Sequence, residues 1–162
     1  MNTIEIERKF LLNTLPDNLE QQPHKIIRQG YITTDSQVEV RVRAKGEDYF
    51  LTVKQGSGLS RNEVEINISA EQFNPLWDLT VNKRVEKTRY NFLDDGLLIE
   101  IDVYCGGLAP LKVAEVEFRS IQESRAFRIP SFLGLEVTDD KAYKNASLAV
   151  QGIPDSYIKD LT

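Results

Sequence analysis

The chain has 162 residues, of which 41% are hydrophobic and 28% charged, as is usual for one globular domain, and no linker-like segment divides it. Its net charge of −5 argues against a general nucleic-acid surface, and no apolar run approaches the roughly 18 residues of a membrane span. The first residues lack the basic and apolar regions of a signal peptide, and Cys105 has no cysteine partner. We therefore expect a single cytoplasmic domain over residues 1–162 that binds neither nucleic acid nor membrane; a homodimer is left open.

The dominant periodicity of the sequence is two, which is the period of a β-strand. In chain order, this pattern predicts eight strands, over residues 3–12, 25–33, 37–45, 48–55, 61–69, 84–93, 97–104 and 112–119. Gly-containing turn segments at 45–48, 56–58 and 94–96 separate several of them.

Helical signals are few. Ser69 and Gln72 have the spacing of a capping box and predict a helix that begins at this point. A second short helix is expected over 121–127 and a third over about 140–150. Many short strands with small helices between them predict a mainly β, α+β fold built on an antiparallel barrel or sandwich.

Full charges occupy one side of most of the predicted strands. Side chains alternate between the two faces of a strand, so each charged set projects one way and the aliphatic residues project the other way. The charged positions, taken strand by strand, are Glu5, Glu7, Lys9, Arg41, Arg43, Lys54, Arg61, Glu63, Glu65, Lys87, Arg89, Glu100, Asp102, Glu115 and Glu117. On one strand, a solvated face with surface ion pairs is the simpler interpretation. Repetition on seven strands instead predicts a closed sheet with a charged interior.

The kinds of charge indicate what such an interior binds. Arg and Lys suit phosphate oxygens, whereas clustered carboxylates suit a hard divalent cation such as Mg²⁺. His24 and Cys105 are too few for an ordinary zinc site, and the sequence has no P-loop. Because burying these charges is costly unless a ligand or ion pairs with them, the pattern predicts a polyanionic ligand that brings cations.

Glu5-Ile6-Glu7-Arg8-Lys9 resembles the E-x-E-x-K signature of the CYTH proteins, also called triphosphate tunnel metalloenzymes. The later motifs follow in the family's order: Arg41-Val42-Arg43, Thr52-Val53-Lys54, Arg61-Asn62-Glu63-Val64-Glu65, Lys87-Thr88-Arg89, Glu100-Ile101-Asp102 and Glu115-Val116-Glu117. The resemblance covers nearly the whole chain and implies an eight-stranded antiparallel β-barrel that forms a charged tunnel. Ala142 departs from the family, in which an Arg commonly stands at this place, so one phosphate or helix-docking contact is in doubt.

Within the family, the chain looks like the short bacterial inorganic triphosphatases. This resemblance implies hydrolysis of inorganic triphosphate to diphosphate and phosphate with Mg²⁺ or Mn²⁺ as cofactor. The expected phosphate-binding residues are Lys9, Arg41, Arg43, Lys54, Arg61 and Arg89. The expected metal-site residues are Glu5, Glu7, Asp102, Glu115 and Glu117, with Glu63, Glu65 and Glu100 binding metal or orienting the cations.

Tyr31 and Lys87 are candidates for proton transfer in catalysis. Lys87 is expected among other cations, whose charges lower the pKa of a lysine, and Tyr31 has the polarity to act with it. An equally good interpretation makes Tyr31 a barrel-lining aromatic with a structural hydrogen bond.

Two other functions stay open on the sequence alone. A nucleoside or other organic triphosphatase, or an adenylate cyclase, needs an aromatic or base pocket; where thiamine triphosphatases stack their substrate, this chain has Val38, Glu39 and Val40. A non-catalytic polyphosphate-binding module needs only the cations, whereas this chain also has each acidic motif.

Overall fold

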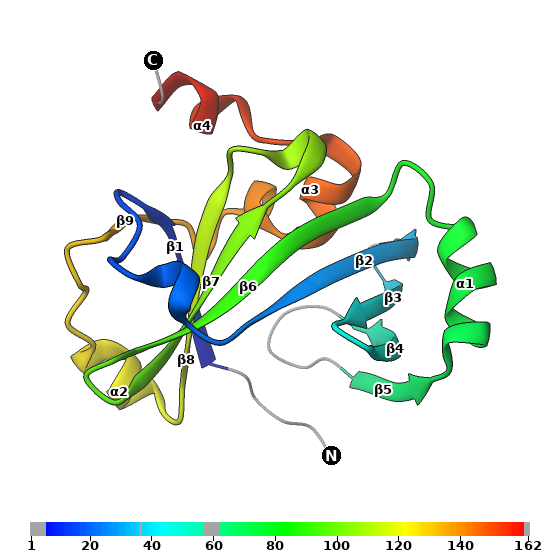
Figure 1. The fold of residues 1–162 in the computed structure, drawn as a ribbon, viewed down its shortest axis with the longest axis horizontal. Helices are drawn as coiled ribbons and strands as arrows, with labels where there is room; N and C mark the ends of the chain where they lie inside the picture. The colour runs from blue at the N-terminus through cyan, green and yellow to red at the C-terminus, as the bar shows by residue number, and fades with distance from the viewer. Residues whose placement is uncertain (1–5, 36, 57–61, 161–162) are drawn as a thin grey trace.

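The computed structural model of the chain describes residues 6–35, 37–56 and 62–160 (Figure 1). Its strands are β1 Ile6–Leu12, β2 His24–Thr34, β3 Val38–Lys45, β4 Asp48–Gln55, β5 Asn62–Ile68, β6 Arg84–Asp94, β7 Leu97–Tyr104, β8 Lys112–Phe118 and β9 Leu133–Glu136. The helices are α1 Ala70–Asp78, α2 Ile121–Ala126, α3 Asn145–Gln151 and α4 Asp155–Asp160, with 3-10 turns η1 Leu19–Gln21, η2 Gly106–Leu108 and η3 Lys141–Tyr143. The expected mainly β class is confirmed. No helix of the described ranges is long and apolar enough to cross a membrane.

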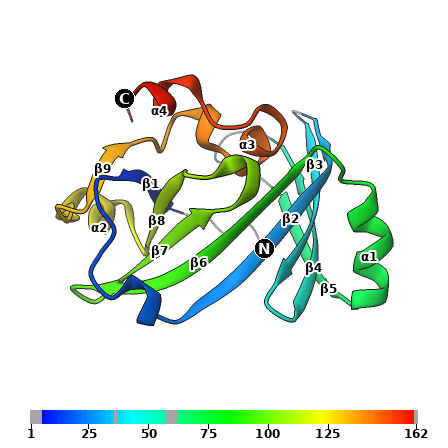
Figure 2. The ribbon, with the colours of Figure 1, turned by 45° about the horizontal axis from the view of Figure 1, so that its top comes forward.

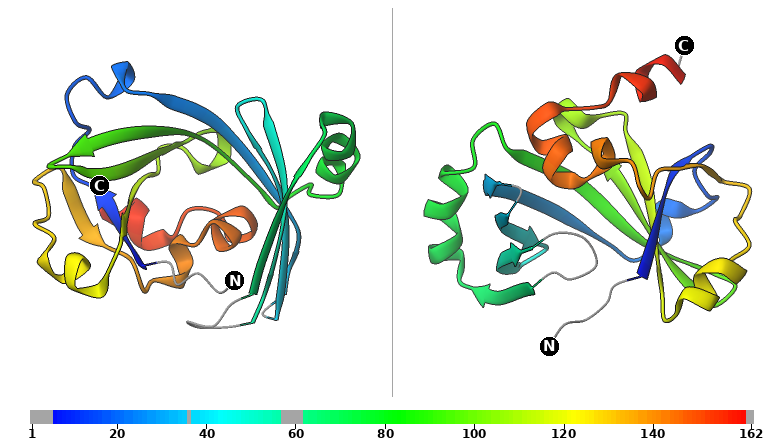
Figure 3. Two further views of the ribbon diagram at one scale, coloured as in Figure 1. Left: turned by 90° about the horizontal axis from the view of Figure 1, so that it is seen from below. Right: turned by 180° about the vertical axis from the view of Figure 1, so that it is seen from behind.

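The nine strands form one sheet in the order β5-β4-β3-β2-β6-β7-β8-β1-β9, and neighbouring strands run antiparallel. All eight predicted strands are present. The ninth, β9, was not predicted, because its four residues, with Gly134 among them, show no clear alternation. β9 pairs with β1 at one edge of the sheet, and β5 forms the other edge. The sheet is strongly curved, but β5 and β9 do not pair with each other among the described residues, so it is not closed (Figure 3). The expected closed eight-stranded barrel is corrected in this respect, since strand periodicity does not specify closure.

Apolar side chains cover the convex face of the sheet, as the alternating pattern predicts. Val42 and Ala44 of β3, with Leu51 of β4 beside them, pack against Phe73 of α1, which lies along the outer side of these strands (Figure 2). On β1, β7 and β8, a larger cluster that includes Phe10 and Ile101 is buried in the same way. The predicted capping box begins α1: the Ser69 hydroxyl accepts from the Gln72 backbone N–H, and the Gln72 amide oxygen accepts from the Ser69 N–H.

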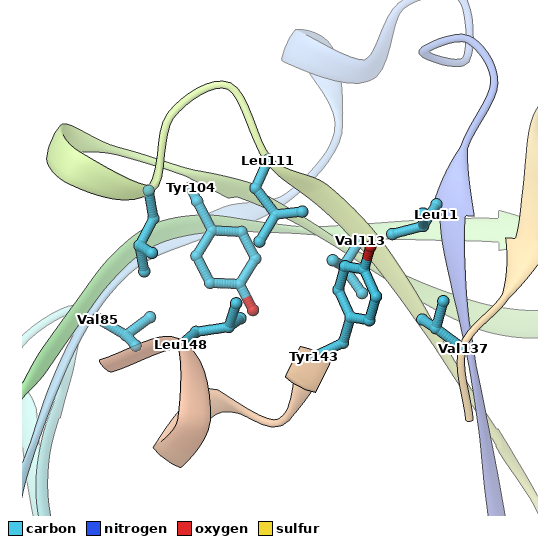
Figure 4. Close-up of a cluster of buried hydrophobic side chains, with 9 residues drawn as sticks. Leu11, Val85, Tyr104, Leu111, Val113, Val137, Tyr143 and Leu148 are labelled. Atoms are coloured by element: carbon cyan, nitrogen blue, oxygen red, sulfur yellow. The ribbon is translucent and has the colours of Figure 1, made fainter. Parts of the chain in front are cut away.

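The concave face changes from apolar to charged along its strands. Leu11, Val85, Tyr104, Val113 and others form an apolar cluster with the C-terminal segment, through Tyr143 and Leu148 (Figure 4). Two positions away on the same strands and the same face stand charged residues, namely Lys9, Lys87, Asp102 and Glu115. The C-terminal segment therefore covers the apolar half of the concave face and leaves the charged half as the wall of a cavity.

This C-terminal segment is less regular than expected. The helix predicted from residue 140 is instead η3, capped by Asp140, followed by α3, with Lys144 in an extended conformation between them. The short α4 that follows was not predicted. The break at Lys144 directs the first residues of α3 toward the cavity.

Candidate functional site

The charged half of the concave face encloses a cavity of about 370 Å³. Its lining residues are Glu7, Lys9, Tyr31, Glu39, Arg41, Arg43, Lys54, Glu63, Glu65, Arg89, Glu100, Glu115, Glu117, Lys144, Asn145 and Ala146. Most of the predicted site residues are therefore brought together from β1 to β8. Lys87 and Asp102 are buried beside the cavity, where Asp102 accepts hydrogen bonds from both Lys87 and Arg89. Glu5 and Arg61 lie outside the described residues.

One side of the cavity, which we call the cation wall, consists of Arg41 and Arg43 on β3 and Lys54 on β4. Arg41 Nη2 is 3.9 Å from a carboxylate oxygen of Glu65, and Lys54 Nζ is 3.9 Å from one of Glu63. These separations are too long for hydrogen bonds. Arg41 Nε is buried without a hydrogen-bond partner among the described residues. A buried guanidinium donor without a partner is costly, so the cation wall is suited to an anionic ligand.

The two arginines of the cation wall also affect each other. Burial, and after it the positive charge of Arg41, lowers the pKa of Arg43 to about 10. Arg43 still stays protonated at neutral pH, and its positive charge then lies close to that of Arg41. A polyanion between them would relieve that repulsion.

The opposite side, which we call the ion-pair wall, comprises Lys87 and Arg89 on β6, Glu100 and Asp102 on β7, and Glu115 on β8. Asp102 accepts from Lys87 Nζ at 2.6 Å and from Arg89 Nε and Nη2 at 2.7 and 2.8 Å. Arg89 also contacts Glu100 and, at 3.3 Å, Glu115. The guanidinium of Arg89 is thus held by three carboxylates.

The ionisation of the ion-pair wall follows from this geometry. Burial by itself would raise the pKa of Asp102, but the charges and hydrogen bonds of Lys87 and Arg89 outweigh it and lower the pKa to about 2. Burial lowers the pKa of Lys87 to about 8, although the charge of Asp102 opposes this change. At neutral pH, Asp102 is therefore ionised and Lys87 is mainly an ammonium. Both oxygens of Asp102 are occupied by these partners, which favours an anchoring role for this carboxylate.

Carboxylates also face one another on neighbouring strands. Glu7 of β1 pairs in register with Glu117 of β8, and Glu100 pairs with Glu115. Like charges directly opposite on a sheet repel each other unless a cation lies between them. Arg89 supplies that cation for Glu100 and Glu115. Glu7 and Glu117 are the carboxylates best placed for an added divalent cation, although no group of three or more metal-binding side chains converges within the described ranges.

Two neutral residues of the site were not predicted, because the charge pattern does not indicate them. Asn145 Oδ1 accepts from the Tyr104 hydroxyl at 2.7 Å and from Lys87 Nζ at 3.3 Å. Gln29 is fully buried and hydrogen-bonds to both Tyr31 and Arg43. Strand alternation was the signal that could have found Gln29, since it places Gln29 and Tyr31 on the same face.

Known proteins resemble this chain over most of its length. The CYTH domain matches residues 3–130. An inorganic triphosphatase of Nitrosomonas europaea is 50% identical over 149 residues, which cover 90% of this chain and 97% of the relative. An inorganic triphosphatase of Acetivibrio thermocellus is 37% identical over 147 residues, which cover 89% and 92%. The crystal structure of the inorganic triphosphatase NE1496 superposes with a TM-score of 0.76 at 46% identity, covering 94% of this chain and 98% of that one.

Proposed function

This chain belongs to the CYTH family, and we propose that it hydrolyses inorganic triphosphate to diphosphate and phosphate in the charged cavity. The observation that carries the proposal is the cavity of about 370 Å³. One wall has Arg41 Nε, which is buried without a hydrogen-bond partner in the part of the chain that the structure describes, and the other wall has carboxylates. The two inorganic triphosphatases that resemble nearly the whole chain support the same substrate.

In this reaction, water attacks a terminal phosphorus and forms a new P–O bond. The bond from that phosphorus to the bridging oxygen breaks, diphosphate leaves, and the water loses a proton. Catalysis of such a transfer consists largely of positioning and of stabilising negative charge. Lys9, Arg41, Arg43, Lys54 and Arg61 are the proposed phosphate-binding residues. Arg89 faces the cavity as well, but its three carboxylate partners make it chiefly an organiser of the ion-pair wall.

CYTH triphosphatases depend on a metal ion, and we propose Mg²⁺ or Mn²⁺ for this chain. The donor set fits such an ion, because the cavity offers carboxylate oxygens without His or Cys, and Mg²⁺ commonly takes one or two carboxylates together with phosphate oxygens. Glu7 and Glu117 would hold it, with Glu5 and Glu115 as further candidates. The metal ion would neutralise phosphate charge and lower the pKa of bound water.

Tyr31 and Lys87 remain the candidates for proton transfer. Burial raises the pKa of Tyr31 to about 12, so its hydroxyl keeps its proton at neutral pH and acts as a donor. Lys87, with a pKa of about 8, is closer to neutrality than an ordinary lysine and can exchange a proton more readily.

Detection of both products from inorganic triphosphate, with Mg²⁺, with Mn²⁺ and with EDTA, tests the proposed reaction. We expect turnover that EDTA abolishes, and we expect Glu117→Gln to lose metal-dependent turnover while it keeps the melting temperature of the wild type. Glu123→Gln, on the surface helix α2 away from the cavity, is the matched control. Failure to release diphosphate and phosphate with either metal would refute the proposed function, and full activity in EDTA would refute the metal assignment.

A further inference from the structure

A buried amide joins the cation wall to Tyr31. Gln29 is 0% exposed and lies on β2, directly opposite Arg43 in the sheet, while Tyr31 lies opposite Arg41. Arg43 Nε donates to Gln29 Oε1 at 3.1 Å, and Gln29 Nε2 donates to the Tyr31 hydroxyl oxygen at 2.7 Å. The Gln29 amide therefore contacts Arg43, a proposed phosphate-binding residue, and Tyr31, a proposed proton donor, at the same time.

The chemistry of Arg43 fixes the orientation of this amide. A guanidinium has donors and no acceptor, so the Gln29 atom that faces it has to be the oxygen. The amide nitrogen then faces Tyr31, and the tyrosine oxygen accepts. The single hydroxyl hydrogen of Tyr31 is not used in this contact, and Tyr31 lines the cavity. Its raised pKa keeps that hydrogen in place at neutral pH.

The strand that carries both residues is held from its other face. Gly30 lies between Gln29 and Tyr31, and a Cβ at this position would be 2.3 Å from Thr80 Oγ1. Thr80 is itself fixed, since its hydroxyl donates to Trp77 O at 2.7 Å and accepts from Arg84 Nε at 3.0 Å. The positions of Gln29 and Tyr31 relative to β3 are therefore well defined.

We propose that Gln29 is a positioning residue that holds Arg43 through its oxygen and, through its nitrogen, directs the Tyr31 hydroxyl hydrogen toward the bound triphosphate. This inference rests on the proposed function, and it adds a neutral residue to a site otherwise described by its charges. The bound triphosphate would then accept hydrogen bonds from the Arg43 guanidinium and the Tyr31 hydroxyl, and Gln29 would set the direction of both donors.

Gln29→Glu tests the direction of the hydroxyl, because the change is nearly isosteric. A carboxylate accepts from both Arg43 and Tyr31, so the hydroxyl hydrogen turns toward the introduced carboxylate and away from the cavity. We expect kcat to fall about tenfold or more, the range for losing one hydrogen bond to a charged group. In a Tyr31→Phe background, where that hydrogen is already missing, we expect the same change to cost no more than about threefold. Gln72→Glu, the same substitution in the exposed capping box of α1, is the control and should leave kcat within about twofold.

The double-mutant cycle separates positioning from a general effect of added charge. The introduced carboxylate repels triphosphate in both backgrounds, so that repulsion cancels in the comparison. An equal loss of kcat in both backgrounds, or no loss in either, would overturn the proposal. Gln29→Met is a second variant that removes both contacts without adding charge, and it should raise KM as well as lower kcat, because Arg43 is also released.

A spectroscopic measurement keeps this test independent of turnover. In protein labelled at the tyrosine Cζ with ¹³C, the Tyr31 resonance is assigned by its loss in Tyr31→Phe. We expect inorganic imidotriphosphate, which binds without hydrolysis, to shift this resonance in the wild type and to shift it much less in folded Gln29→Glu saturated with the same probe. Equal shifts in both would overturn the role of Gln29 even if triphosphate is hydrolysed. If the wild type binds the probe but does not turn over triphosphate, the proposed reaction fails while this measurement still decides the role of Gln29.

Discussion

The two walls of the cavity hold the same kinds of side chain in opposite ways. On the cation wall, Arg41 lies 3.9 Å from a carboxylate oxygen of Glu65 and Lys54 lies 3.9 Å from one of Glu63, and Arg41 keeps a buried donor without a partner among the described residues. On the ion-pair wall, Asp102 binds Lys87 and Arg89 at 2.6 to 2.8 Å. The cation wall thus keeps one buried arginine donor without a partner among the described residues, whereas the donors of Lys87 and Arg89 are bound by carboxylates of their own wall.

A charged motif on a strand therefore does not by itself identify a ligand contact. A cation that is held loosely can exchange its partner for phosphate at low cost, whereas the release of Lys87 or Arg89 would leave a buried carboxylate uncompensated. We therefore assign binding mainly to the cation wall and the shape of the cavity mainly to the ion-pair wall.

Replacement of Asp102, which anchors the ion-pair wall, should give the largest loss in the free energy of unfolding. Asp102→Ala leaves the buried ammonium of Lys87 without its carboxylate, and we expect it to lower the free energy of unfolding by about 3–5 kcal/mol. Urea denaturation monitored by circular dichroism measures this change. Glu63→Gln, on the exposed strand β5, should cost less than about 1 kcal/mol. Similar losses in the two variants would contradict the division between the walls.

Removing a cation from the cation wall should weaken triphosphate binding without unfolding the protein. We expect Arg41→Ala and Arg43→Ala each to weaken triphosphate binding by roughly 1.5–3 kcal/mol, the range for hydrogen bonds to charged groups. Arg41→Ala should also raise the melting temperature of the ligand-free protein, because the charge of Arg41 disfavours the protonated form of Arg43. Arg43→Ala should not raise it, because this change leaves the buried Gln29 oxygen without its donor. Calorimetry of triphosphate binding and thermal melts provide the measurements. Unchanged affinity would show that these side chains do not contact the ligand.

Acid should weaken the ion-pair wall through Asp102. The pKa of this carboxyl is lowered from 3.8 to about 2, so its stabilising contribution is present above pH 3.8 and is lost as the pH falls through about 2. We expect the wild type to lose roughly 2 kcal/mol more of unfolding free energy than Asp102→Asn over this interval. Urea titrations of both proteins between pH 5 and pH 2 test this, and parallel curves would contradict the assignment.

The smallest expected effect concerns substrate choice. Tyr31 is the only aromatic among the described residues that line the cavity, while Trp77 stacks on Phe73 of α1 and Tyr104 is buried in the core. A nucleoside would therefore gain little binding free energy. We expect kcat/KM for inorganic triphosphate to exceed that for ATP at least about tenfold, which corresponds to about 1.4 kcal/mol. Kinetics at fixed free Mg²⁺ decide this, and equal efficiency on ATP or release of cyclic AMP would favour the nucleotide alternative.

Sequence alternation predicted the strands and the side of each strand that faces the cavity, because burial of one face fixes the register of side chains. It did not predict that Asp102 is buried beneath that surface while Glu117 is exposed on it, since both occupy equivalent positions of an alternating strand. β9 was missed because pairing with β1, and not its own periodicity, makes it a strand. Gln29 and Asn145 were missed because they are neutral. The cytoplasmic location, a homodimer and the absence of nucleic-acid binding stay at the level of prediction.

The strand order also determines when the cavity can be completed during synthesis. β2 to β5 pair through short connections, so the cation wall consists of neighbours in sequence. β1, in contrast, pairs with β8, and Ile6 lies opposite Phe118, so this pairing joins residues that are far apart in the sequence. Pairs so distant in sequence close late and slowly. We therefore expect a nascent chain to expose an organised cluster of phosphate-binding cations before Glu7 meets Glu117, and to be most prone to capture cellular polyanions in that interval.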